Sequence, residues 1–279
     1  MKVIACVVLY NPDDMMLGNI LSYYYKINEL IIIDNSPVRS DFFYHYFKDE
    51  SRTEYVFFGE NLGIATALNT ACRLALDKGY NWILTMDQDS RFVDDSFFSL
   101  LQKGFSPEVA IYAASYTDVF GRWLKPYDSD FNEIHFAISS GNLLHLNKWE
   151  EVEGFEDKLF IDEVDHDFCL KLRLKKYKIL TSREILLSHT VGVKDSVNLT
   201  NKSKTSSRPQ PIRFYYITRN GLYMIKRYFI KDFWFAGNRL FYFGKAILRI
   251  IFLYPDKTQY LKYLCLGIKD FFRSRYGRL

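Results

Sequence analysis

Two aspartates one residue apart mark the position where this chain is most expected to do chemistry. Asp87, Gln88 and Asp89 directly follow the apolar run Trp82-Ile83-Leu84-Thr85-Met86. A strand that ends in such a pair presents it at the carboxyl edge of a sheet, where open α/β folds bind ligands. Hard divalent cations prefer oxygen ligands and share their coordination with phosphates. The pair therefore predicts a metal-bridged diphosphate.

A second group of carboxylates lies in the stretch Phe160-Ile161-Asp162-Glu163-Val164-Asp165-His166-Asp167. On a helix with 3.6 residues per turn, Asp162 and Asp165 share a face, whereas Asp167 lies about 200° from Asp165. Asp167 can instead pair with Lys171, four residues on. Asp165 is then the best candidate for a general base aimed into a cleft. The alternative is a structural role, because acids are favoured at a helix start by its dipole.

Single polar or small residues stand at other expected strand and helix ends. Asp34 ends the apolar run Leu30-Ile31-Ile32-Ile33, where a carboxylate can bond to a nucleotide base or sugar or simply cap the next turn. Gly63 allows a close backbone approach at a helix start, with plain helix packing as the alternative. His189 and Arg219 are candidates for a metal or phosphate contact, and structural roles stay open for both.

The elements that must position these residues alternate along the chain. Apolar runs predict strands at residues 3–9, 30–33, 55–58, 82–86 and 109–114. Apolar residues at helical spacing predict a helix that begins near Ile64 and is closed by Gly79, and another helix over about residues 163–175. Strands that alternate with helices through short connections predict an α/β fold, with a parallel sheet covered on both faces.

Composition excludes several classes of protein. The chain has 279 residues and 48% hydrophobic residues, enough for a sizeable core, and its net charge of +4 is too small to argue for nucleic-acid binding. Its four cysteines, Cys6, Cys72, Cys169 and Cys265, have no metal-ligand spacing, so we expect them reduced and buried in a cytosolic chain. The apolar N-terminus is interpreted as a first strand rather than a signal peptide.

The last quarter of the chain has a different character. A polar loop is expected over residues 196–211, followed by an aromatic and basic region. Arg239, Lys245 and Arg249 fall on one stripe of a predicted helix, with aromatic residues largely off that stripe. Such a helix can lie in a membrane interface, or it can be an ordinary surface helix. We predict a catalytic domain over residues 1–211 and a helical region over 212–279 that can associate with a membrane surface.

The order and spacing of these features carry a family resemblance. In sequence come Asn11-Pro12, Asp34-Asn35-Ser36, the stretch from Asn61 to Asn69, Asp87-Gln88-Asp89, Ser139-Ser140-Gly141-Asn142, Gly154-Phe155-Glu156, the acidic stretch to Asp167, His189 and Arg219-Asn220. The series resembles the family 2 glycosyltransferases, and within them the bacterial rhamnosyltransferase-like branch, over about residues 1–225. It implies an A-type glycosyltransferase fold: a Rossmann-like nucleotide-binding half with a mostly parallel central sheet, and an acceptor half.

The resemblance also implies roles for single residues. Asp165 would be the catalytic base of an inverting transfer, although many relatives have Glu-Asp there, so the neighbouring Asp162 and Glu163 stay open as bases. Asp89 and His189 would hold Mg²⁺ or Mn²⁺. Donor contacts would come from Asn11, Asp34, Asn61, Gly63, Asn69, Asp87 and Arg219, and acceptor or supporting contacts from Gly141, Asp162 and Asp167.

The substrates follow from the resemblance as well. The donor would be a nucleoside-diphosphate sugar, with dTDP-rhamnose expected and UDP-sugars left open. The acceptor would be a glycan or a polyprenyl-linked glycan in surface polysaccharide synthesis, on the cytoplasmic side and at the inner face of the cell membrane.

The sequence leaves two alternatives to a glycosyltransferase. The paired aspartates also occur in haloacid-dehalogenase-like phosphatases, but Arg91 stands where that motif normally has Thr or Val, and three predicted strands precede the pair. The other alternative is a module that binds a nucleotide sugar without catalysis.

Overall fold

The computed structural model describes residues 2–100, 105–117, 131–189, 210–254 and 256–279. The chain divides into two compact units. One, the α/β unit, comprises Met1–Phe160 and Val164–Thr190; the other, the helical unit, comprises Ile161–Glu163 and Val191–Leu279. The polar loop predicted at 196–211 falls almost wholly outside the described residues, and the domain boundary predicted at residue 211 stays a prediction.

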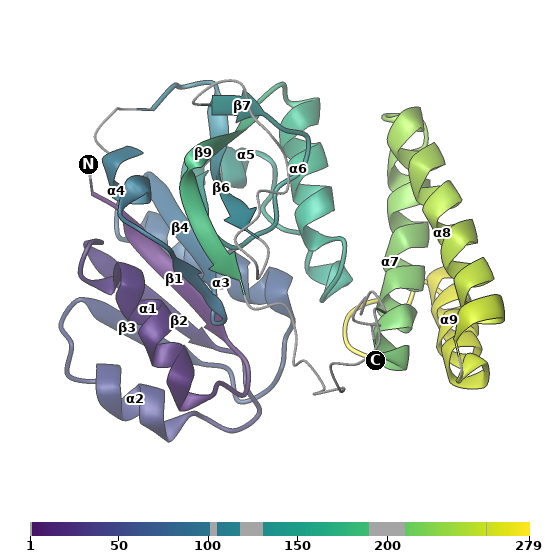
Figure 1. The fold of residues 1–279 in the computed structure, drawn as a ribbon, viewed down its shortest axis with the longest axis horizontal. Coiled ribbons are helices and arrows are strands. Elements are labelled where there is room, and N and C mark those ends of the chain that lie inside the picture. The colour runs from purple at the N-terminus through teal and green to yellow at the C-terminus, as the bar shows by residue number, and fades with distance from the viewer. Residues whose placement is uncertain (1, 101–104, 118–130, 190–209, 255) are drawn as a thin grey trace, which may run out of the picture. The chain divides into compact units, whose positions relative to one another are not determined.

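Four parallel strands form the first half of the sheet in the α/β unit. They are β1 (Ile4–Leu9), β2 (Glu29–Asp34), β3 (Thr53–Phe57) and β4 (Trp82–Asp87), in the order β3-β2-β1-β4 (Figure 1). Each coincides with a strand predicted from an apolar run, within three residues. All four carboxyl ends therefore meet at one edge, and the polar residues that follow these strands gather there.

The second half of the sheet is mixed. It contains β5 (Ser90–Phe92), β6 (Val109–Thr117), β7 (Phe131–Glu133), β8 (Asn142–His145) and β9 (Lys178–His189). Among the described residues, nine strands form one sheet in the order β3-β2-β1-β4-β8-β6-β9-β5, with β7 also on β9. The pair β6–β9 is parallel, whereas β8 runs antiparallel to both β4 and β6, and β5 and β7 run antiparallel to β9. The expected α/β architecture is confirmed, with the parallel arrangement concentrated in the first half.

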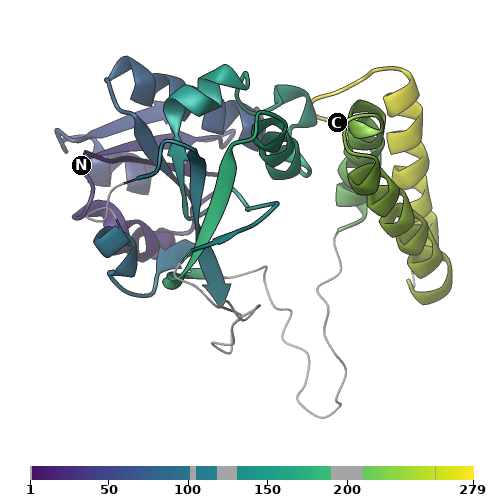
Figure 2. The same ribbon diagram turned by 90° about the horizontal axis from the view of Figure 1, so that it is seen from above.

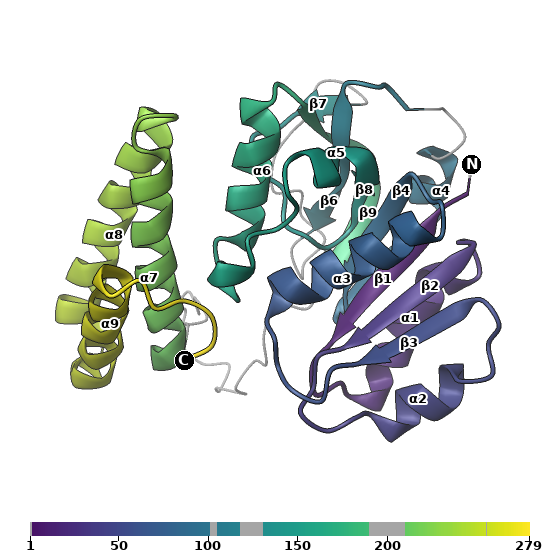
Figure 3. The same ribbon diagram turned by 180° about the vertical axis from the view of Figure 1, so that it is seen from behind.

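Helices cover both faces of this sheet. Figures 1 and 3 show α1 (Leu17–Tyr24) and α4 (Ser96–Leu100) over one face, and α3 (Ile64–Asp77), α5 (Leu146–Glu151) and α6 (Val164–Leu174) over the other. The short helix α2 (Asp41–Phe47) contributes to the same core as α1, and 3₁₀ turns occur at Asp14–Met16 and Asp157–Leu159. The helix predicted from Ile64 is confirmed, since α3 ends at Asp77; its C-cap is Lys78 rather than Gly79, which follows in a left-handed conformation with φ of +79°.

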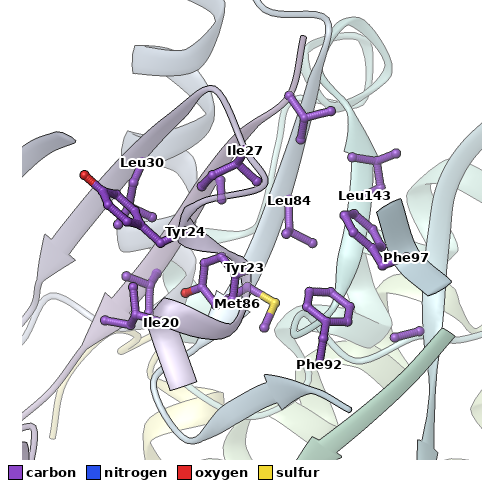
Figure 4. Close-up of a cluster of buried hydrophobic side chains, with 14 of the residues drawn as sticks. Ile20, Tyr23, Tyr24, Ile27, Leu30, Leu84, Met86, Phe92, Phe97 and Leu143 are labelled. Carbon is purple, nitrogen blue, oxygen red and sulfur yellow. The ribbon is translucent and has the colours of Figure 1, made fainter. Parts of the chain in front are cut away.

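The main hydrophobic core lies between the sheet and α1. Successive residues of a strand point to opposite faces, and Ala5, Val7 and Leu9 of β1 join this core. Figure 4 shows Tyr23 and Met86 meeting within it. On the other face, the buried stripe of α3 covers the sheet. Every residue of β1 is buried, because both faces are covered.

The described part of the helical unit contains three helices: α7 (Pro211–Tyr228), α8 (Phe233–Leu253) and α9 (Lys257–Phe272). Asp232 caps α8 by accepting a hydrogen bond from the Phe235 amide at 2.9 Å. Gly267 lets α9 approach α7, since a Cβ there would lie 2.7 Å from the Tyr215 carbonyl oxygen. Within the described part of the chain, no helix combines the length and apolar character needed to span a membrane.

Two local predictions need correction. The helix expected over about residues 163–175 is itself confirmed by α6, but it begins at Val164, because Asp162 and Glu163 adopt left-handed conformations with φ of +61° and +66°. Asp162 is therefore not on the same helix as Asp165, and the shared helical face predicted for them is wrong. All four cysteines are free, but Cys265 is exposed rather than buried.

Candidate active site

Asp34 and Asp87 flank the central strand β1 at the carboxyl edge of the sheet. Leu9 pairs with Asp34 on one side, and Val8 pairs with Asp87 on the other. Since neighbouring strands lie about 4.8 Å apart, the backbones of the two aspartates are roughly 10 Å apart. A ligand bound across this edge can therefore meet both.

Asp34 is completely buried and accepts three hydrogen bonds. The donors are the amides of Ser36 at 3.1 Å and Ser40 at 3.0 Å, and the Tyr55 hydroxyl at 2.6 Å. Burial and this contact with the carboxylate raise the pKa of Tyr55, so the phenol stays protonated and remains a donor. Asp34 thus organises the loop after β2, and its expected contact with a donor nucleotide stays a prediction.

Asparagine amides connect the neighbouring loops. The Asn35 side chain donates to Asn61 Oδ1 at 3.1 Å and accepts from the Leu62 amide at 2.7 Å. Asn61 Oδ1 also accepts from the Gly63 amide at 3.0 Å. Asn11 adopts φ of +44°, and its backbone amide donates to Ser36 Oγ at 2.8 Å. These bonds hold the ends of β1 and β2 against the start of α3.

Gly63 and Asn69 contact the segment that leads to Asp165. Gly63 has φ of +89°, a Cβ there would lie 2.6 Å from the Phe160 carbonyl oxygen, and the Ile64 amide donates to that oxygen at 2.8 Å. The close approach that Gly63 permits is thus to Phe160. Asn69 Oδ1 accepts from the Phe155 amide at 2.9 Å, and its Nδ2 donates to the Phe155 carbonyl at 2.9 Å. The framework role of both residues is visible, and their expected contact with a donor stays a prediction.

Gln88 connects the paired aspartates to β1. Its Oε1 accepts from the Tyr10 amide at 2.8 Å, and its Nε2 donates to the Tyr10 carbonyl at 3.2 Å. The Asp87 amide donates to Ser140 Oγ at 3.0 Å. Asp87 and Asp89 are both half-buried. The intervening glutamine therefore fixes the backbone of the strand end that carries the two carboxylates.

Strand pairing also brings His189 to this region. The antiparallel register of β5 and β9 places His189 opposite Ser90, the residue after Asp89. Among the described side chains, no group of three or more His, Cys, Asp or Glu residues is arranged to hold a metal. Mg²⁺ is nevertheless often bound by one or two carboxylates together with substrate phosphates and water. Asp87 and Asp89 fit that form of site, in which a substrate diphosphate would supply further oxygen ligands.

Asp165 lines a small pocket beside β4. Thr85, Ser139 and Asn142 line the same pocket, together with apolar side chains and Cys169. Burial raises the pKa of the Cys169 thiol to about 12, so this pocket has no thiolate nucleophile at neutral pH. Thr85 stands two residues before Asp87, and residues at i and i+2 of a strand share a face. Thr85 and Asp87 therefore share one face of the sheet, and Asp165, which lines the pocket with Thr85, lies on that same face.

Gly141 and Asp167 support this pocket in different ways. Gly141 has φ of +73°, its amide donates to the Thr85 carbonyl at 2.8 Å, and a Cβ there would lie 2.9 Å from Ala114 Cβ. It thus holds the segment with Ser139 against β4. Asp167 is fully buried, with a carboxylate oxygen 3.4 Å from Lys171 Nζ. The predicted Asp167–Lys171 pair is confirmed, and Asp165 alone of the two acids lines the pocket.

Asp162 belongs to the helical unit. It forms an ion pair with Arg213 at 2.8 Å. The buried Asn220 side chain donates to the carbonyls of Ile161 at 2.7 Å and Asp162 at 3.1 Å, and Arg239 pairs with Glu163 at 2.6 Å. These contacts hold the left-handed residues directly before α6, so Asp162 and Glu163 are committed to ion pairs within this unit.

Arg219 is placed differently from expectation. It is completely buried in the helical unit. Its guanidinium donates to Asn220 Oδ1 at 3.0 Å, the Tyr215 hydroxyl at 3.2 Å and the Gly277 carbonyl at 2.7 Å. These bonds orient the Asn220 amide. We therefore assign Arg219 a supporting role within the helical unit in place of the expected phosphate contact.

Sequence reasoning missed several residues of the site. The sequence marks Tyr55 only as part of a predicted strand, and Thr85 only as part of an apolar run. Neither carries a local signal, because Tyr55 reaches Asp34 from a neighbouring strand, and Thr85 lines the same pocket as Asp165, which is 80 residues away in the chain. Gln88 could have been found, since a polar side chain held between two functional aspartates is expected to have a fixed partner.

The fold and the site together define an A-type glycosyltransferase: a parallel nucleotide-binding half with aspartates at its carboxyl edge, joined to a mixed half that contributes a pocket carboxylate. The chain belongs to glycosyl transferase family 2, whose family model matches residues 14–180. This family assignment decides against the phosphatase alternative.

Individual proteins extend this comparison. The chain is 25% identical to the dTDP-rhamnosyl transferase RfbF of Shigella flexneri over 300 residues, covering 99% of this chain and 97% of that protein. Among solved structures, S. aureus TarS 1–349 in complex with UDP-GlcNAc matches with a TM-score of 0.65 and 14% identity, covering 99% of this chain and 82% of that one. GalNAc-T7 with UDP, GalNAc and Mn²⁺ matches with a TM-score of 0.58 and 10% identity, covering 69% of this chain and 44% of that one. These two structures support the fold alone.

Proposed function

We propose that this glycosyltransferase moves rhamnose, with inversion, from dTDP-rhamnose to a hydroxyl of a glycan or lipid-linked glycan in surface polysaccharide synthesis. The observation that carries the reaction type is the pocket lined by both Asp165 and Thr85. Thr85 lies two residues before Asp87, which ends the same strand. The sugar is proposed from the similarity to a dTDP-rhamnosyl transferase, and UDP-sugars are the competing donors.

The donor is proposed to lie across the carboxyl edge of β1, β2 and β4. Asp34 would meet the base or ribose after a small rearrangement of the loop that it organises, and Asp87 would lie near the ribose and diphosphate. Asn11 and Asn61 belong to the same edge and would shape its surface. We propose no direct donor contact for Arg219, since its guanidinium is used inside the helical unit.

A divalent cation, Mg²⁺ or Mn²⁺, fits the same edge. Asp89 would hold it together with Asp87, and His189 is a further candidate because of its register opposite Ser90. When bound, the cation neutralises negative charge on the departing nucleoside diphosphate.

The chemistry then falls to Asp165. Its carboxylate takes the proton of the acceptor hydroxyl while the hydroxyl oxygen bonds to the anomeric carbon of the sugar. The bond from that carbon to the diphosphate oxygen breaks, and its electron pair leaves with the nucleoside diphosphate. Attack from the face opposite the leaving group inverts the anomeric configuration, and no covalent enzyme intermediate is formed. The apolar lining beside Asp165, which includes Phe155 and Phe168, limits the access of water to the reacting hydroxyl.

We place the reaction on the cytoplasmic side, at the inner face of the cell membrane, where a lipid-linked acceptor would be presented. The aromatic and basic composition of residues 212–279 supports this location.

Replacing Asp165 by Asn tests the proposed function directly. We expect transfer from dTDP-rhamnose to fall by about 10²–10⁴-fold, the usual contribution of general base catalysis, with binding of the nucleotide sugar retained in calorimetry. Asp77→Asn, at an exposed position at the end of α3, is the matched control. Full turnover by Asp165→Asn would show that another group is the base, and binding without transfer by the unchanged protein would favour a non-catalytic module.

A further inference from the structure

The helical unit carries a continuous exposed apolar surface along α8. On a helix with 3.6 residues per turn, most of its exposed large apolar side chains fall within an arc of about 120°: Phe233, Trp234, Leu240, Phe241, Leu248, Ile251 and Phe252. Tyr242 is also exposed and lies about 80° beyond one edge of this arc. Phe235 and Ile250 lie on the other side of the helix and are buried. The described residues of the unit thus bury one side of α8 and leave a face of large apolar side chains exposed.

The corner between α7 and α8 extends this surface. Figures 1 and 2 show these helices as a pair joined at one end. At the junction, Ile230 is 94% exposed and Trp234 is 79% exposed. Phe229 and Phe233 are also exposed, with their rings 5.4 Å apart. Ile230 is almost as accessible as in an unfolded chain, so the fold itself gains nothing from an apolar residue there.

Basic residues border the face. Lys245 and Arg249 are exposed and lie about 20° and 60° beyond one edge of the apolar arc, and Lys231 is exposed at the corner. Arg239, which the sequence pattern grouped with these cations, is not one of them, because it pairs with Glu163 at 2.6 Å. The helix α8 contains no Asp or Glu, so nothing on it offsets the charge of the border.

The charge of the whole region favours an anionic partner. Residues 210–279 contain 14 Lys and Arg against 3 Asp and no Glu, whereas the whole chain has 37 basic and 33 acidic residues. A second copy of this chain would bring two such strongly positive regions together, and like charges disfavour that contact. Anionic lipid headgroups satisfy the cations, while the acyl boundary takes up the aromatic and aliphatic side chains.

We propose that the α8 face and the α7–α8 corner form a docking surface for an anionic lipid bilayer. Ile230, Phe233 and Trp234 enter the interface at the corner, α8 lies along it, and Lys231, Lys245 and Arg249 contact headgroups. This docking surface would bring the enzyme to a lipid-linked acceptor, so its biological purpose rests on the proposed function. The binding itself involves neither Asp165 nor the donor edge.

The test is flotation of the full chain with vesicles of phosphatidylcholine alone or mixed with phosphatidylglycerol. We expect binding to the anionic vesicles that weakens as salt rises, because the electrostatic attraction is screened. Reversing Lys245 and Arg249 to Glu should lower the partition coefficient by at least about tenfold, since each cation near an anionic surface contributes roughly fivefold. Replacing Ile230 and Trp234 by Ser should lower it by a similar factor.

Matched controls come from the α/β unit. Lys48→Glu with Lys175→Glu changes the net charge by the same amount, and Met15→Ser with Val38→Ser removes two other exposed apolar side chains. Both control variants should bind vesicles like the unchanged protein. Equal losses in test and control variants, or no preference for phosphatidylglycerol, would overturn the proposal. A third result would also overturn the proposal: the protein does not bind vesicles, and light scattering shows a dimer that the Trp234→Ser substitution dissociates. The face would then be an interface between two copies of the chain.

Nucleotide-sugar binding, measured on the same variants without vesicles, separates the two proposals. We expect it to be unchanged in the surface variants. Vesicle binding by Asp165→Asn at the level of the unchanged protein would support the docking surface even if transfer were shown to use another base.

Discussion

The hydrogen bond from Tyr55 to Asp34 gives the sharpest test of how the donor edge is built. The Asp34 carboxylate is fully buried and accepts three hydrogen bonds, of which the Tyr55 hydroxyl makes the shortest at 2.6 Å. Replacing Tyr55 by Phe keeps the ring and removes this donor. A hydrogen bond to a charged group contributes about 1.5–3 kcal/mol.

Two structural details narrow this magnitude. The oxygen that loses Tyr55 keeps the Ser40 amide at 3.0 Å, so it is not left without a partner. Tyr55 itself is only half-buried, so water can partly replace the hydroxyl. We therefore expect the lower part of the range, a loss of about 1.5–2 kcal/mol in the free energy of unfolding of the α/β unit.

The assay is urea unfolding followed by fluorescence, which reports stability through the midpoint at constant m-value. Tyr44→Phe is the matched control, since the Tyr44 ring packs 5.5 Å from that of Tyr55 but its hydroxyl is not among the donors to Asp34. We expect that variant to stay within about 0.5 kcal/mol of the unchanged protein. Equal effects of the two substitutions would refute the reasoning.

Binding of a nucleoside diphosphate to Tyr55→Phe adds a functional measurement. If Asp34 meets the donor, loss of its orienting partner should weaken binding several-fold, since the carboxylate is then less fixed. Lower stability with unchanged affinity would instead assign Asp34 to the framework of the loop after β2.

Two further predictions concern backbone conformation and pH. Gly63→Ala should destabilise the α/β unit by about 3 kcal/mol or more in thermal unfolding, because φ of +89° and a Cβ 2.6 Å from the Phe160 carbonyl oxygen both oppose a side chain. The control is Gly18→Ala, which has open space around it and should be neutral or slightly stabilising. A Gly63→Ala variant as stable as the unchanged protein would contradict the close approach of Gly63 to Phe160. Burial and the nearby Lys148 lower the pKa of His145 below its ordinary value, so the unfolded chain takes up the proton first and the free energy of unfolding should fall as pH drops below about 6.5. In denaturant titrations at several pH values, His145→Asn should reduce this dependence of the free energy of unfolding on pH, whereas the control His45→Gln, at an exposed position, should not. An unchanged pH dependence in His145→Asn would show that other groups cause it.

Local patterns in the sequence determined much of the α/β unit. The apolar runs located β1, β2 and β4 because a strand buried on both faces is almost wholly apolar. A shorter apolar run located β3, which is only partly buried, and helical spacing located α3. The carboxyl ends of parallel strands share an edge, so the gathering of Asp34, Asp87 and Asn61 at one side of the sheet also followed from the sequence. The pair of Asp167 with Lys171 followed from helix geometry alone.

Only the tertiary structure decided which groups these residues meet. Tyr55 reaches Asp34 across 21 residues, Asn220 reaches Ile161 across 59, and Thr85 shares a pocket with Asp165. Such contacts depend on strand order, strand register and packing between helices, which a single sequence does not specify locally. The same reason explains the arginines that look like free cations in the sequence: Arg219 makes buried hydrogen bonds, and Arg239 forms an ion pair. It also explains why Ile230 and Trp234 are exposed at the α7–α8 corner.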